Sequence, residues 1–299
     1  MSKSIQRCCG YCAIVGRPNV GKSTLLNRLI GQKLAITSHK PQTTRHSILG
    51  VKNLDNGQVI YVDTPGIHQR TDHAMNRYLN RTARSALADV DLLLFIVEAL
   101  CWTEEDKAVL ELIEKLNTPV ILVVNKIDTI KKKELLLPFL AKIFQLYDFQ
   151  EVIPASALKG DNIPTLENRV LSFLPAGDNY FPEDQLTDRP ERFFAAEFVR
   201  EQLTRRYAKE IPYSLTVEIE KFVEESELYR ISALIWVERP GQKNIIIGNK
   251  GEALKAVGTQ ARLEMEKLFG KKVFLQLWVK IKKSWSSDKA ALSRLGYND

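Results

Sequence analysis

The stretch Gly16-Arg17-Pro18-Asn19-Val20-Gly21-Lys22-Ser23 decides the fold of this 299-residue chain. It matches the pattern G-x-x-x-x-G-K-[ST] and lies between an apolar run, Tyr11–Val15, and an amphipathic stretch, Lys22–Ile30. A strand, a glycine-rich turn and a helix form the context in which this pattern binds phosphates. Backbone N–H groups and the helix dipole would hold the phosphates, Lys22 would reach the β- and γ-phosphates, and Ser23 would bind Mg²⁺. We therefore predict a phosphate-binding loop over residues 16–23.

Outward from this loop, the first half of the chain alternates strand-like and helical segments. Such alternation favours an α/β domain with a mostly parallel sheet that helices cover on both faces. Ligands of these sheets bind at the carboxyl ends of the strands, so motifs that directly follow strands are candidates for one site. The predicted strands are Tyr11–Val15, Gln58–Val62, Leu92–Val97, Val120–Val124 and Glu151–Pro154, and the predicted helices are Lys22–Ile30, Ala74–Ala88, Glu104–Leu116 and Leu136–Leu146.

The composition is that of a globular protein, with 44% apolar and 26% charged residues. No apolar run approaches the roughly 20 residues that span a membrane, and residues 1–10 lack the apolar core of a secretory signal. We therefore expect a cytoplasmic protein. Cys9 and Cys12 form a C-x-x-C pair without the second pair that a structural zinc site needs, so we interpret them as reduced thiols near the start of a strand.

The segment Asp63-Thr64-Pro65-Gly66 follows the strand-like run that ends at Val62. An aspartate here would orient the water ligands of Mg²⁺, and the N–H of Gly66 would bond the γ-phosphate, so the loop after it would sense that phosphate. Taken alone, the pattern also fits a buried strand residue followed by a Pro-Gly turn.

The segment Asn125-Lys126-Ile127-Asp128 follows the strand predicted over Val120–Val124. The carboxylate of Asp128 would accept from two donors on the guanine edge, a pair that adenine lacks, and a wrong base would leave buried polar groups unpaired. Asn125 would tie loops together and face the base, and the Lys126 stem would cover its plane. Ser156 and Ala157 follow the next strand, where the N–H of Ala157 would face the guanine oxygen.

The loop Pro41-Gln42-Thr43-Thr44-Arg45 lies between the phosphate loop and Asp63. A threonine in this loop would complete the Mg²⁺ shell when a triphosphate is bound; we favour Thr44, with Thr43 as the alternative. Ile67 follows Gly66 at the place where Ras-type enzymes carry a water-orienting glutamine. Isoleucine cannot bond water, so hydrolysis should be slow unaided or use another group. His68 is a candidate base, although a loop histidine is more often simply solvated.

The second half of the chain begins after a turn-rich stretch around Leu174–Pro190. Its predicted order is helix, two strands, two helical pieces around Gly248–Gly251, and a final strand; the ranges are Arg192–Lys209, Tyr213–Val223, Leu228–Glu238, Glu252–Phe269 and Lys272–Ile281. Residues 239–283 hold 11 basic and three acidic residues, a net charge of +8 within a chain whose total is +7. This concentration of positive charge indicates a polyanionic partner.

The sequence Gly248-Asn249-Lys250-Gly251 has the G-x-x-G form of the loop with which KH modules clamp a nucleic-acid backbone. The alternative is a plain turn between two helices; the element order and the positive charge favour RNA binding. We expect Ile246 and Ile247 to floor an apolar groove for single-stranded bases, and we expect phosphate contacts from Arg239, Lys243, Lys250 and Lys255. The later segment 280–285, which ends at Trp285, would stack a base or lie on a membrane, or it is a strand end with a capping tryptophan.

Together, the motifs at 16–27, 41–46, 63–68 and 125–128 resemble those of the Era family, bacterial ribosome-assembly GTPases. The resemblance covers essentially the whole chain, and the second half is similar to a type II KH domain. It implies a G domain over 1–176, a linker over 177–190, a KH domain over 191–285 and a tail over 286–299. It also implies a GTP-hydrolysing switch that binds 16S ribosomal RNA near its 3′ end during small-subunit assembly.

Further expectations follow from this resemblance. GTP, GDP and Mg²⁺ would be ligands, and related GTPases that lack the glutamine often bind K⁺ at an asparagine in the position of Asn19. Family members are cytoplasmic and partly associated with the inner face of the cell membrane, and we expect a monomer.

Three other classes of protein share some of these features. A tandem-GTPase or tRNA-modifying relative would need a second G domain or a cysteine-bearing domain. An RNA-binding protein with a purely structural G domain would not need Lys22, Ser23, Asp63 and Asp128 together. A membrane-trafficking GTPase would carry lipidation signals, but Ser2 stands where myristoylation needs glycine.

Overall fold

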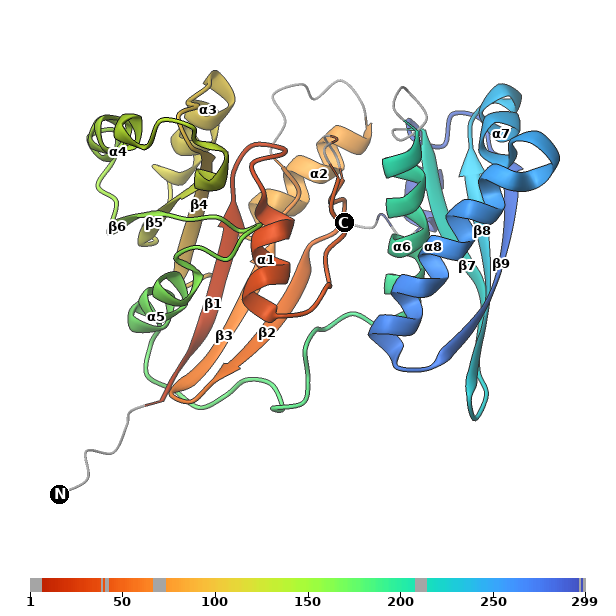
Figure 1. Cartoon of the computed structure of the whole chain (residues 1–299), viewed down its shortest axis with the longest axis horizontal. Coiled ribbons are helices and arrows are strands. Elements are labelled where there is room, and N and C mark those ends of the chain that lie inside the picture. The colour runs from red at the N-terminus through yellow and green to blue at the C-terminus, as the bar shows by residue number, and fades with distance from the viewer. Residues whose placement is uncertain are drawn as a thin grey trace. The chain divides into compact units, whose positions relative to one another are not determined.

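A computed structural model describes residues 7–38, 40, 43–66, 74–207, 214–295 and 297 of the chain. The described residues of Met1–Ala35, Thr44–Arg70 and Leu79–Asp188 form one compact unit, and those of Ile36–Thr43, Thr71–Tyr78 and Arg189–Asp299 form a second (Figure 1).

The first unit contains a six-stranded sheet in the order β2-β3-β1-β4-β5-β6. All neighbouring strands are parallel except β2, which runs antiparallel to β3 at one edge. The mostly parallel sheet predicted from the sequence is therefore confirmed. The strands are β1 (Cys8–Val15), β2 (Ile48–Leu54), β3 (Gly57–Asp63), β4 (Leu92–Glu98), β5 (Val120–Asn125) and β6 (Glu151–Pro154).

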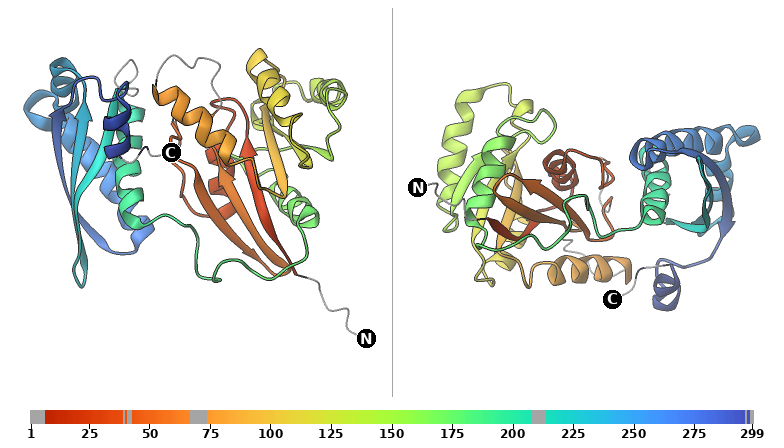
Figure 2. Two further views of the ribbon diagram at one scale, coloured as in Figure 1. Left: turned by 180° about the vertical axis from the view of Figure 1, so that it is seen from behind. Right: turned by 90° about the horizontal axis from the view of Figure 1, so that it is seen from below.

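Helices lie on both faces of this sheet (Figures 1 and 2). Alternate strand residues explain this arrangement, because successive side chains of a strand point to opposite faces. One set, which includes Val15, Phe95 and Leu122, packs with α3 and α4 in a buried apolar core. The helices of this unit are α1 (Lys22–Ile30), α2 (Ala74–Ser85, shared with the second unit), α3 (Glu104–Ile113), α4 (Leu136–Phe144) and α5 (Ile163–Phe173).

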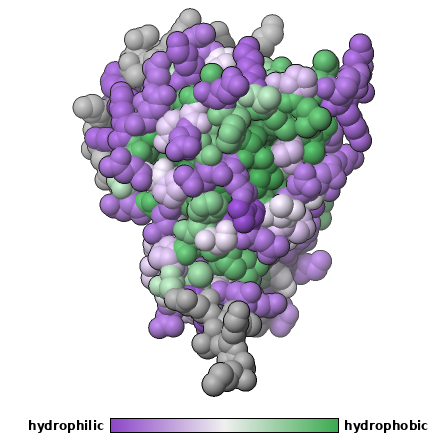
Figure 3. Space-filling model, turned by 90° about the vertical axis from the view of Figure 1, so that its left-hand side faces the viewer, coloured by the Kyte–Doolittle hydropathy of each residue, from purple (hydrophilic) through white to green (hydrophobic). Residues whose placement is uncertain are grey.

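Helix α4 is apolar on its outer side as well as on its inner side. Ile143 is buried in the core, whereas Leu137 and Phe144 are 74% and 53% exposed. Figure 3 views the side of the molecule on which α4 lies and shows apolar residues gathered between polar ones. A surface helix of this kind usually marks an interaction surface, because single globular domains bury most such stripes.

The second unit has a three-stranded sheet in the order β7-β8-β9, in which β7 and β8 are antiparallel and β8 and β9 are parallel. Helices α6 and α8 pack together, α6 against β7 and α8 against β9 (Figure 2). The predicted element order is confirmed. The elements are α6 (Glu191–Arg206), β7 (Leu215–Glu224), β8 (Leu228–Val237), α7 (Pro240–Ile247), a short 3₁₀ turn (Asn249–Gly251), α8 (Glu252–Phe269), β9 (Lys272–Ile281) and α9 (Lys289–Arg294).

Several elements differ from the sequence-based expectations. The strand β2 and the helices α5 and α9 were not predicted, and α6 ends at Arg206. Lys209 and Tyr213, the predicted end of that helix and start of the next strand, lie outside the described residues. No helix in the described ranges is both long enough and apolar enough to cross a bilayer.

The proposed roles of Trp285 in base stacking or membrane contact are corrected. Its side chain is 0% exposed, its indole N–H donates to the carbonyl of Ser214 at 3.2 Å, and its ring stacks on Tyr297. Trp285 therefore packs within the second unit as the capping tryptophan of a strand end, which was the alternative interpretation.

Candidate functional site

The loop Gly16–Ser23 connects the end of β1 to the start of α1, as predicted. Its backbone requires glycine: a Cβ on Gly16 would lie 2.5 Å from the carbonyl oxygen of Ile96, and one on Gly21 would lie 2.3 Å from Nδ2 of Asn125. Gly21 also has a φ of +104°, a conformation that side chains disfavour. Asn19 adopts a φ of +65°, which asparagine tolerates better than most residues. Close packing and backbone conformation together fix these positions.

Lys22 is buried at the first turn of α1, with 6% of its surface exposed. Its Nζ donates to the carbonyls of Gly16 and Arg17, each at 2.9 Å, so the side chain folds back across the loop. Burial lowers the pKa of Lys22 to about 8, although the nearby Asp63 opposes this shift. A phosphate group in the loop would supply the negative charge that this lysine lacks.

Ser23, Thr44 and Asp63 meet from three separate segments. The Ser23 hydroxyl donates to Oδ2 of Asp63 at 2.8 Å and lies 2.8 Å from the Thr44 hydroxyl. Asp63 is 0% exposed, and burial raises its pKa to about 6 against the opposing effects of Lys22 and the two hydroxyls. Among the described residues, its Oδ1 finds no hydrogen-bond partner. Two hydroxyls beside a buried carboxylate with an available oxygen fit Mg²⁺, which prefers oxygen ligands.

The alternative threonine has a different environment. The Thr43 hydroxyl donates to the carbonyl of Lys40 at 2.6 Å, whereas the Thr44 hydroxyl lies 3.4 Å from Oδ2 of Asp63. The structure thus brings Thr44, the favoured candidate, to Ser23 and Asp63. Pro41 and Gln42 of the same loop lie outside the described residues.

The segment after β3 lies against the phosphate loop. The Thr64 hydroxyl donates to the carbonyl of Ile14 at 2.9 Å. A Cβ on Gly66 would lie 3.0 to 3.2 Å from atoms of Pro18, so a larger residue would press on the phosphate loop. Pro65, between Thr64 and Gly66, is buried. Ile67 and His68, the two residues discussed for catalysis, lie outside the described residues.

The predicted base-recognition residues gather at the ends of β5 and β6. Asn125 donates from Nδ2 to the carbonyl of Val20 at 2.8 Å, and its Oδ1 accepts from the N–H of Ala157 at 2.9 Å. Ser156 donates to Oδ1 of Asp128 at 2.5 Å, and Asp128 is exposed. The segment Ile127–Thr129 forms a 3₁₀ turn that presents this carboxylate.

The N–H of Ala157, which we expect to face the guanine oxygen, donates to Oδ1 of Asn125 in this structure. Asn125 therefore ties the base-recognition loops to the phosphate loop, as predicted, and it does so with both ends of its amide.

Two residues without a predicted role, Glu98 and Asp106, contact these loops. The Arg17 guanidinium bonds Oδ2 of Asp106 through Nε at 3.1 Å and Oε2 of Glu98 through Nη2 at 3.3 Å. The same Glu98 oxygen accepts from Nζ of Lys126 at 2.9 Å. Glu98 and Asp106 belong to no binding motif; the one sequence signal was the Thr103-x-x-Asp106 pattern of a helix start.

The G-x-x-G loop lies between α7 and α8, where the sequence placed it. Gly248 and Gly251 have φ values of +72° and +83°, and a Cβ on Gly248 would lie 2.6 Å from Cβ of Ala253. Lys250 is exposed with a φ of +47°, and Asn249 is also exposed. The loop backbone is therefore accessible at its tip, with a lysine beside it.

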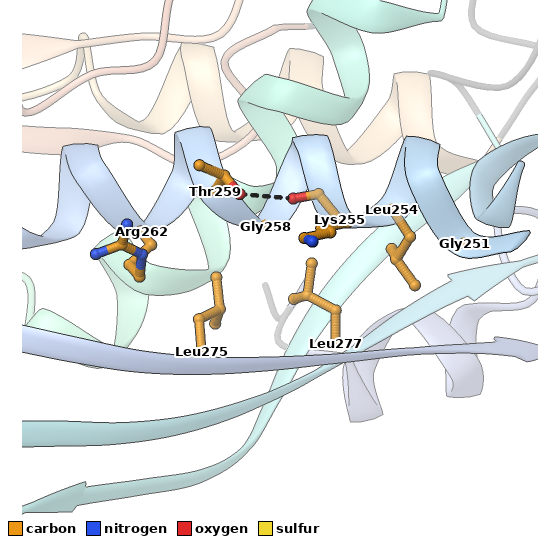
Figure 4. A pocket seen from close by; sticks show the side chains of 8 residues that line it. All are labelled: Gly251, Leu254, Lys255, Gly258, Thr259, Arg262, Leu275 and Leu277. Atoms are coloured by element: carbon orange, nitrogen blue, oxygen red, sulfur yellow. Dashed lines mark hydrogen bonds between the residues drawn. The ribbon is translucent and has the colours of Figure 1, made fainter.

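A groove of about 360 Å³ runs from this loop between α8 and β9 (Figure 4). Leu275 and Leu277 project from β9 towards α8, and the small Gly258 lies opposite, where a Cβ would be 3.2 Å from Leu277. The leucines are apolar and the rim is basic, a combination suited to bases and phosphates. The lining residues are Gly251, Leu254, Lys255, Gly258, Thr259, Arg262, Leu275 and Leu277.

The groove corrects part of the sequence-based assignment. Ile246 is 0% exposed and cannot contact a base, whereas Leu275 and Leu277 line the groove. Ile247 is half-buried, and its expected contact with RNA stays a prediction. Lys255 lines the groove as expected, whereas Arg239 and Lys243 lie in α7 or at its start. The helical spacing of Leu254, Gly258 and Arg262 was the signal that sequence reasoning missed, because these positions share one face of α8.

The second unit also contains the loop segment that precedes Thr44. Within this unit, the N–H of Thr37 donates to Oε1 of Glu201 at 2.9 Å, and Arg205 donates to the Thr37 hydroxyl at 2.9 Å. Arg200, fully buried beside Glu197, donates to the carbonyl of Thr43. Side chains of α6 thus hold the backbone of Thr37 and of Thr43.

Two family models match the chain. A model described as a 50S ribosome-binding GTPase matches residues 11–126, and a KH-domain model matches residues 210–286. The first covers the phosphate loop through Lys126, and the second covers the G-x-x-G loop and the groove.

Similar proteins extend this match to nearly the whole chain. GTPase Era of Marinobacter nauticus is 55% identical over 97% of this chain and 95% of its own length, and GTPase Era of Coxiella burnetii is 55% identical over 97% and 98%. The crystal structure of a single-site variant of Aquifex aeolicus Era bound to GDP·AlF₄⁻ superposes with a TM-score of 0.94 at 40% identity, covering 98% of this chain and all of that one.

A structure of Era in complex with MgGDPNP and nucleotides 1506–1542 of 16S ribosomal RNA gives the same TM-score, identity and coverage. Identity above half over almost the full length, with both domains matched in order, leaves one assignment. The chain belongs to the Era family of GTPases.

Proposed function

We propose that the cluster at Gly16–Ser23, Thr44, Asp63–Gly66, Asn125–Asp128 and Ser156–Ala157 is where this GTPase binds GTP and GDP. The observation that carries the proposal is the meeting of Ser23, Thr44 and Asp63 beside the phosphate loop. Ser23 and Thr44 would bind Mg²⁺, Asp63 would orient its water ligands, and Lys22 would contact the β- and γ-phosphates. Asp128, exposed at the end of β5, would select guanine.

We also propose that the second unit binds 16S ribosomal RNA near its 3′ end and that the protein acts in small-subunit assembly. A relative that matches 98% of this chain has been seen with nucleotides 1506–1542 of that RNA. The groove between α8 and β9 supports this, because it joins an apolar floor to Lys255, Arg262 and the exposed Lys250. Single-stranded RNA needs both kinds of contact. We also propose that the GTPase domain ends at residue 176 and that the RNA-binding domain begins at residue 191.

The bound nucleotide, GTP or GDP, would influence the RNA groove through helix α6. Glu201 holds the backbone of Thr37, and Arg200 holds that of Thr43, which directly precedes the proposed Mg²⁺ ligand Thr44. Helix α6 also packs on the groove helix α8. Ordering of this loop around a γ-phosphate would therefore change the contacts of α6. Equal RNA affinity in the GDP and GTP-analogue states would contradict this switch.

We further propose a K⁺ site in the phosphate loop and a cytoplasmic location with contact to the cell membrane. Asn19, at a φ of +65° in the phosphate loop, would bind K⁺, and the charge of that ion would stabilise the negative charge that develops on the phosphates during hydrolysis. The protein would be a cytoplasmic monomer with peripheral association with the inner face of the cell membrane. The exposed Leu137 and Phe144 of α4, with the lysines at 131–133 before them, support a surface contact of this kind.

One experiment tests the combined function. RNA crosslinked to the protein in cells is sequenced for wild type and for Lys22→Ala, and GTP turnover is measured for the same pair. We expect crosslinks near the 3′ end of 16S RNA, with GTP turnover lost in Lys22→Ala. Crosslinks elsewhere would contradict the RNA assignment, and full turnover in the variant would contradict the nucleotide site.

A further inference from the structure

The Arg17 side chain lies at the junction of the phosphate loop with β4 and α3. Its backbone carbonyl accepts from Lys22, so the main chain of Arg17 belongs to the phosphate loop. Its guanidinium instead bonds Glu98, at the end of β4, and Asp106, in the first turn of α3. Burial lowers the pKa of Arg17, but the charge and hydrogen bond of Asp106 outweigh this effect and raise it overall. The guanidinium is thus a permanent cation committed to two carboxylates.

Glu98 contacts both loops of the nucleotide site through one oxygen. Oε2 lies 3.3 Å from Nη2 of Arg17 and 2.9 Å from Nζ of Lys126. Burial raises the pKa of Glu98, but Lys126 and Arg17 more than offset this and hold it below its usual range, so the carboxylate stays ionised at neutral pH. One anion therefore joins a phosphate-loop residue to a residue of the base-recognition loop.

Lys126 is constrained at its backbone as well as at the end of its side chain. It has a φ of +66°, in the left-handed region that residues with a side chain rarely adopt. Strain of this kind persists only where surrounding contacts hold the residue in place. The ion pair with Glu98 fixes the far end of the side chain, so the alkyl stem between the two fixed ends has a defined direction.

Asp106 anchors the other end of the arrangement. It is 0% exposed, and its Oδ2 accepts from Arg17, from the N–H of Thr103 at 2.9 Å and from the Thr103 hydroxyl at 2.8 Å. The carboxylate therefore caps α3 and holds Arg17 with the same oxygen. Because α3 packs into the core through Val109 and Ile113, Arg17 is tied to the rigid part of the domain.

We propose that Glu98 is a positioning residue that sets the Lys126 stem relative to the phosphate loop, through Arg17 and Asp106, and thereby fixes the spacing between the phosphate and base subsites. The inference rests on the proposed nucleotide site. A guanine nucleotide joins its base and its phosphates covalently and occupies both subsites at once, so subsites that are held at the right spacing before binding lower the conformational cost of binding.

This role differs from that of a simple stabilising salt bridge. The side chains of Glu98 and Lys126 are each 31% exposed, and an ion pair that water reaches contributes little to folding. Arg17 keeps its second partner, Asp106, when the charge of Glu98 is removed. Loss of the Glu98 charge should therefore change nucleotide binding far more than it changes thermal stability.

The test compares Glu98→Gln with Glu105→Gln, the same substitution at an exposed carboxylate of α3. We expect GDP to dissociate about five- to ten-fold faster from Glu98→Gln, with a matching rise in the KM for GTP and a much smaller change in kcat, since about one charged hydrogen bond per loop is weakened. The melting temperatures of the two nucleotide-free variants should agree within about 2 °C. Equal GDP dissociation rates in the two variants would overturn the proposal.

A double-mutant cycle with Lys126→Met identifies the route. Methionine keeps most of the apolar stem and removes the charge, so the Glu98→Gln change should add less than about two-fold to the GDP dissociation rate in a Lys126→Met background. Additive effects would show that Glu98 acts independently of Lys126 and would overturn the proposal. Asp128→Asn distinguishes a failure of the proposed nucleotide site from a failure of the proposed role of Glu98. If Asp128→Asn leaves guanine selectivity intact, the proposed site is wrong. If selectivity is lost but the effects of Glu98→Gln and Lys126→Met are additive, only the role of Glu98 is refuted.

Discussion

The hydroxyl of Ser23 and the carboxylate of Asp63 meet at 2.8 Å across 40 residues of sequence. Ser23 lies in the first turn of α1, which follows β1, and Asp63 is the last residue of β3, the strand beside β1 in the sheet. Thr44 joins them from the intervening loop. Two residues of the proposed Mg²⁺ site, Ser23 and Asp63, therefore belong to regular elements of the domain. The third, Thr44, lies in a loop and directly follows Thr43, which Arg200 of α6 contacts.

The different contacts of Thr43 and Thr44 predict different effects when each hydroxyl is removed. Thr44→Ala should weaken binding of a GTP analogue in Mg²⁺ about ten-fold and leave GDP binding nearly unchanged, because only a triphosphate would order this loop. Thr43→Ala is the matched control, since its hydroxyl bonds the Lys40 carbonyl instead. Fluorescent-nucleotide titrations with and without Mg²⁺ measure both; a larger effect from Thr43→Ala would reverse the assignment.

The burial of Asp63 predicts that the nucleotide-free protein becomes less stable to unfolding as the Asp63 carboxyl loses its proton. Its pKa is raised to about 6 in the folded state from 3.8, so the folded state binds the extra proton between these values and stability falls as pH rises through this window. Replacing Asp63 by Asn removes the charge. As the pH rises from about 4.5 to 7.5, the unfolding free energy of Asp63→Asn minus that of wild type should therefore increase by about 2 kcal/mol.

Urea titrations at the two pH values, without nucleotide or Mg²⁺, measure this difference. Asp55→Asn, at an exposed turn, reports the effect of removing a carboxylate that is not buried. A pH-independent difference between Asp63→Asn and wild type would show that the Asp63 charge is not what the fold disfavours.

The position of Asn19 predicts a dependence on potassium. GTP turnover should fall about ten-fold when K⁺ is replaced by Na⁺ at constant ionic strength, because a Na⁺ ion is too small for a site of the same oxygen spacing. Asn19→Ala should lose the K⁺ response, with the low rate in both salts. Unchanged turnover on exchanging the two ions would contradict the K⁺ proposal.

The groove between α8 and β9 predicts a selective effect on RNA. Gly258→Val adds bulk where even a Cβ would lie 3.2 Å from Leu277, so it should narrow the groove and weaken binding of a single-stranded 16S fragment by about ten-fold or more. Gly177→Val, where a Cβ has no neighbour within 4 Å, is the matched control. RNA affinity follows from fluorescence anisotropy, with GDP affinity as a check on the first unit. Equal RNA affinity in both variants would mean that the RNA lies elsewhere.

The strands that carry the motifs could be predicted because each is a continuous apolar run. β4 and β5, for example, are buried on both faces, which parallel strands require. β2 was missed because Ile48–Leu54 mixes Gly50, Lys52 and Asn53 among its apolar residues, as an antiparallel edge strand can. α5 was missed although Ile163, Leu166 and Val170 have helical spacing.

Within the site, the motif residues were predictable but their connections were not. Glu98 and Asp106 lie 81 and 89 residues from Arg17, and neither belongs to a pattern that specifies a ligand. Ile246 failed as a groove residue for a related reason: an apolar run shows that side chains pack, but it does not show which of them face the core. Only the packing of α8 on β9 determines that Leu275 and Leu277 face the groove.

The close approach of Gly21 to Asn125 has a consequence for how this site can change during evolution. A Cβ on Gly21 would collide with the Asn125 amide, and that amide in turn holds Val20 and the backbone of Ala157. A substitution at Asn125 would therefore disturb the phosphate loop and the base-recognition loops in the same step. Asn125 should consequently change far more slowly during evolution than the lining of the RNA groove, whose residues all belong to the second unit.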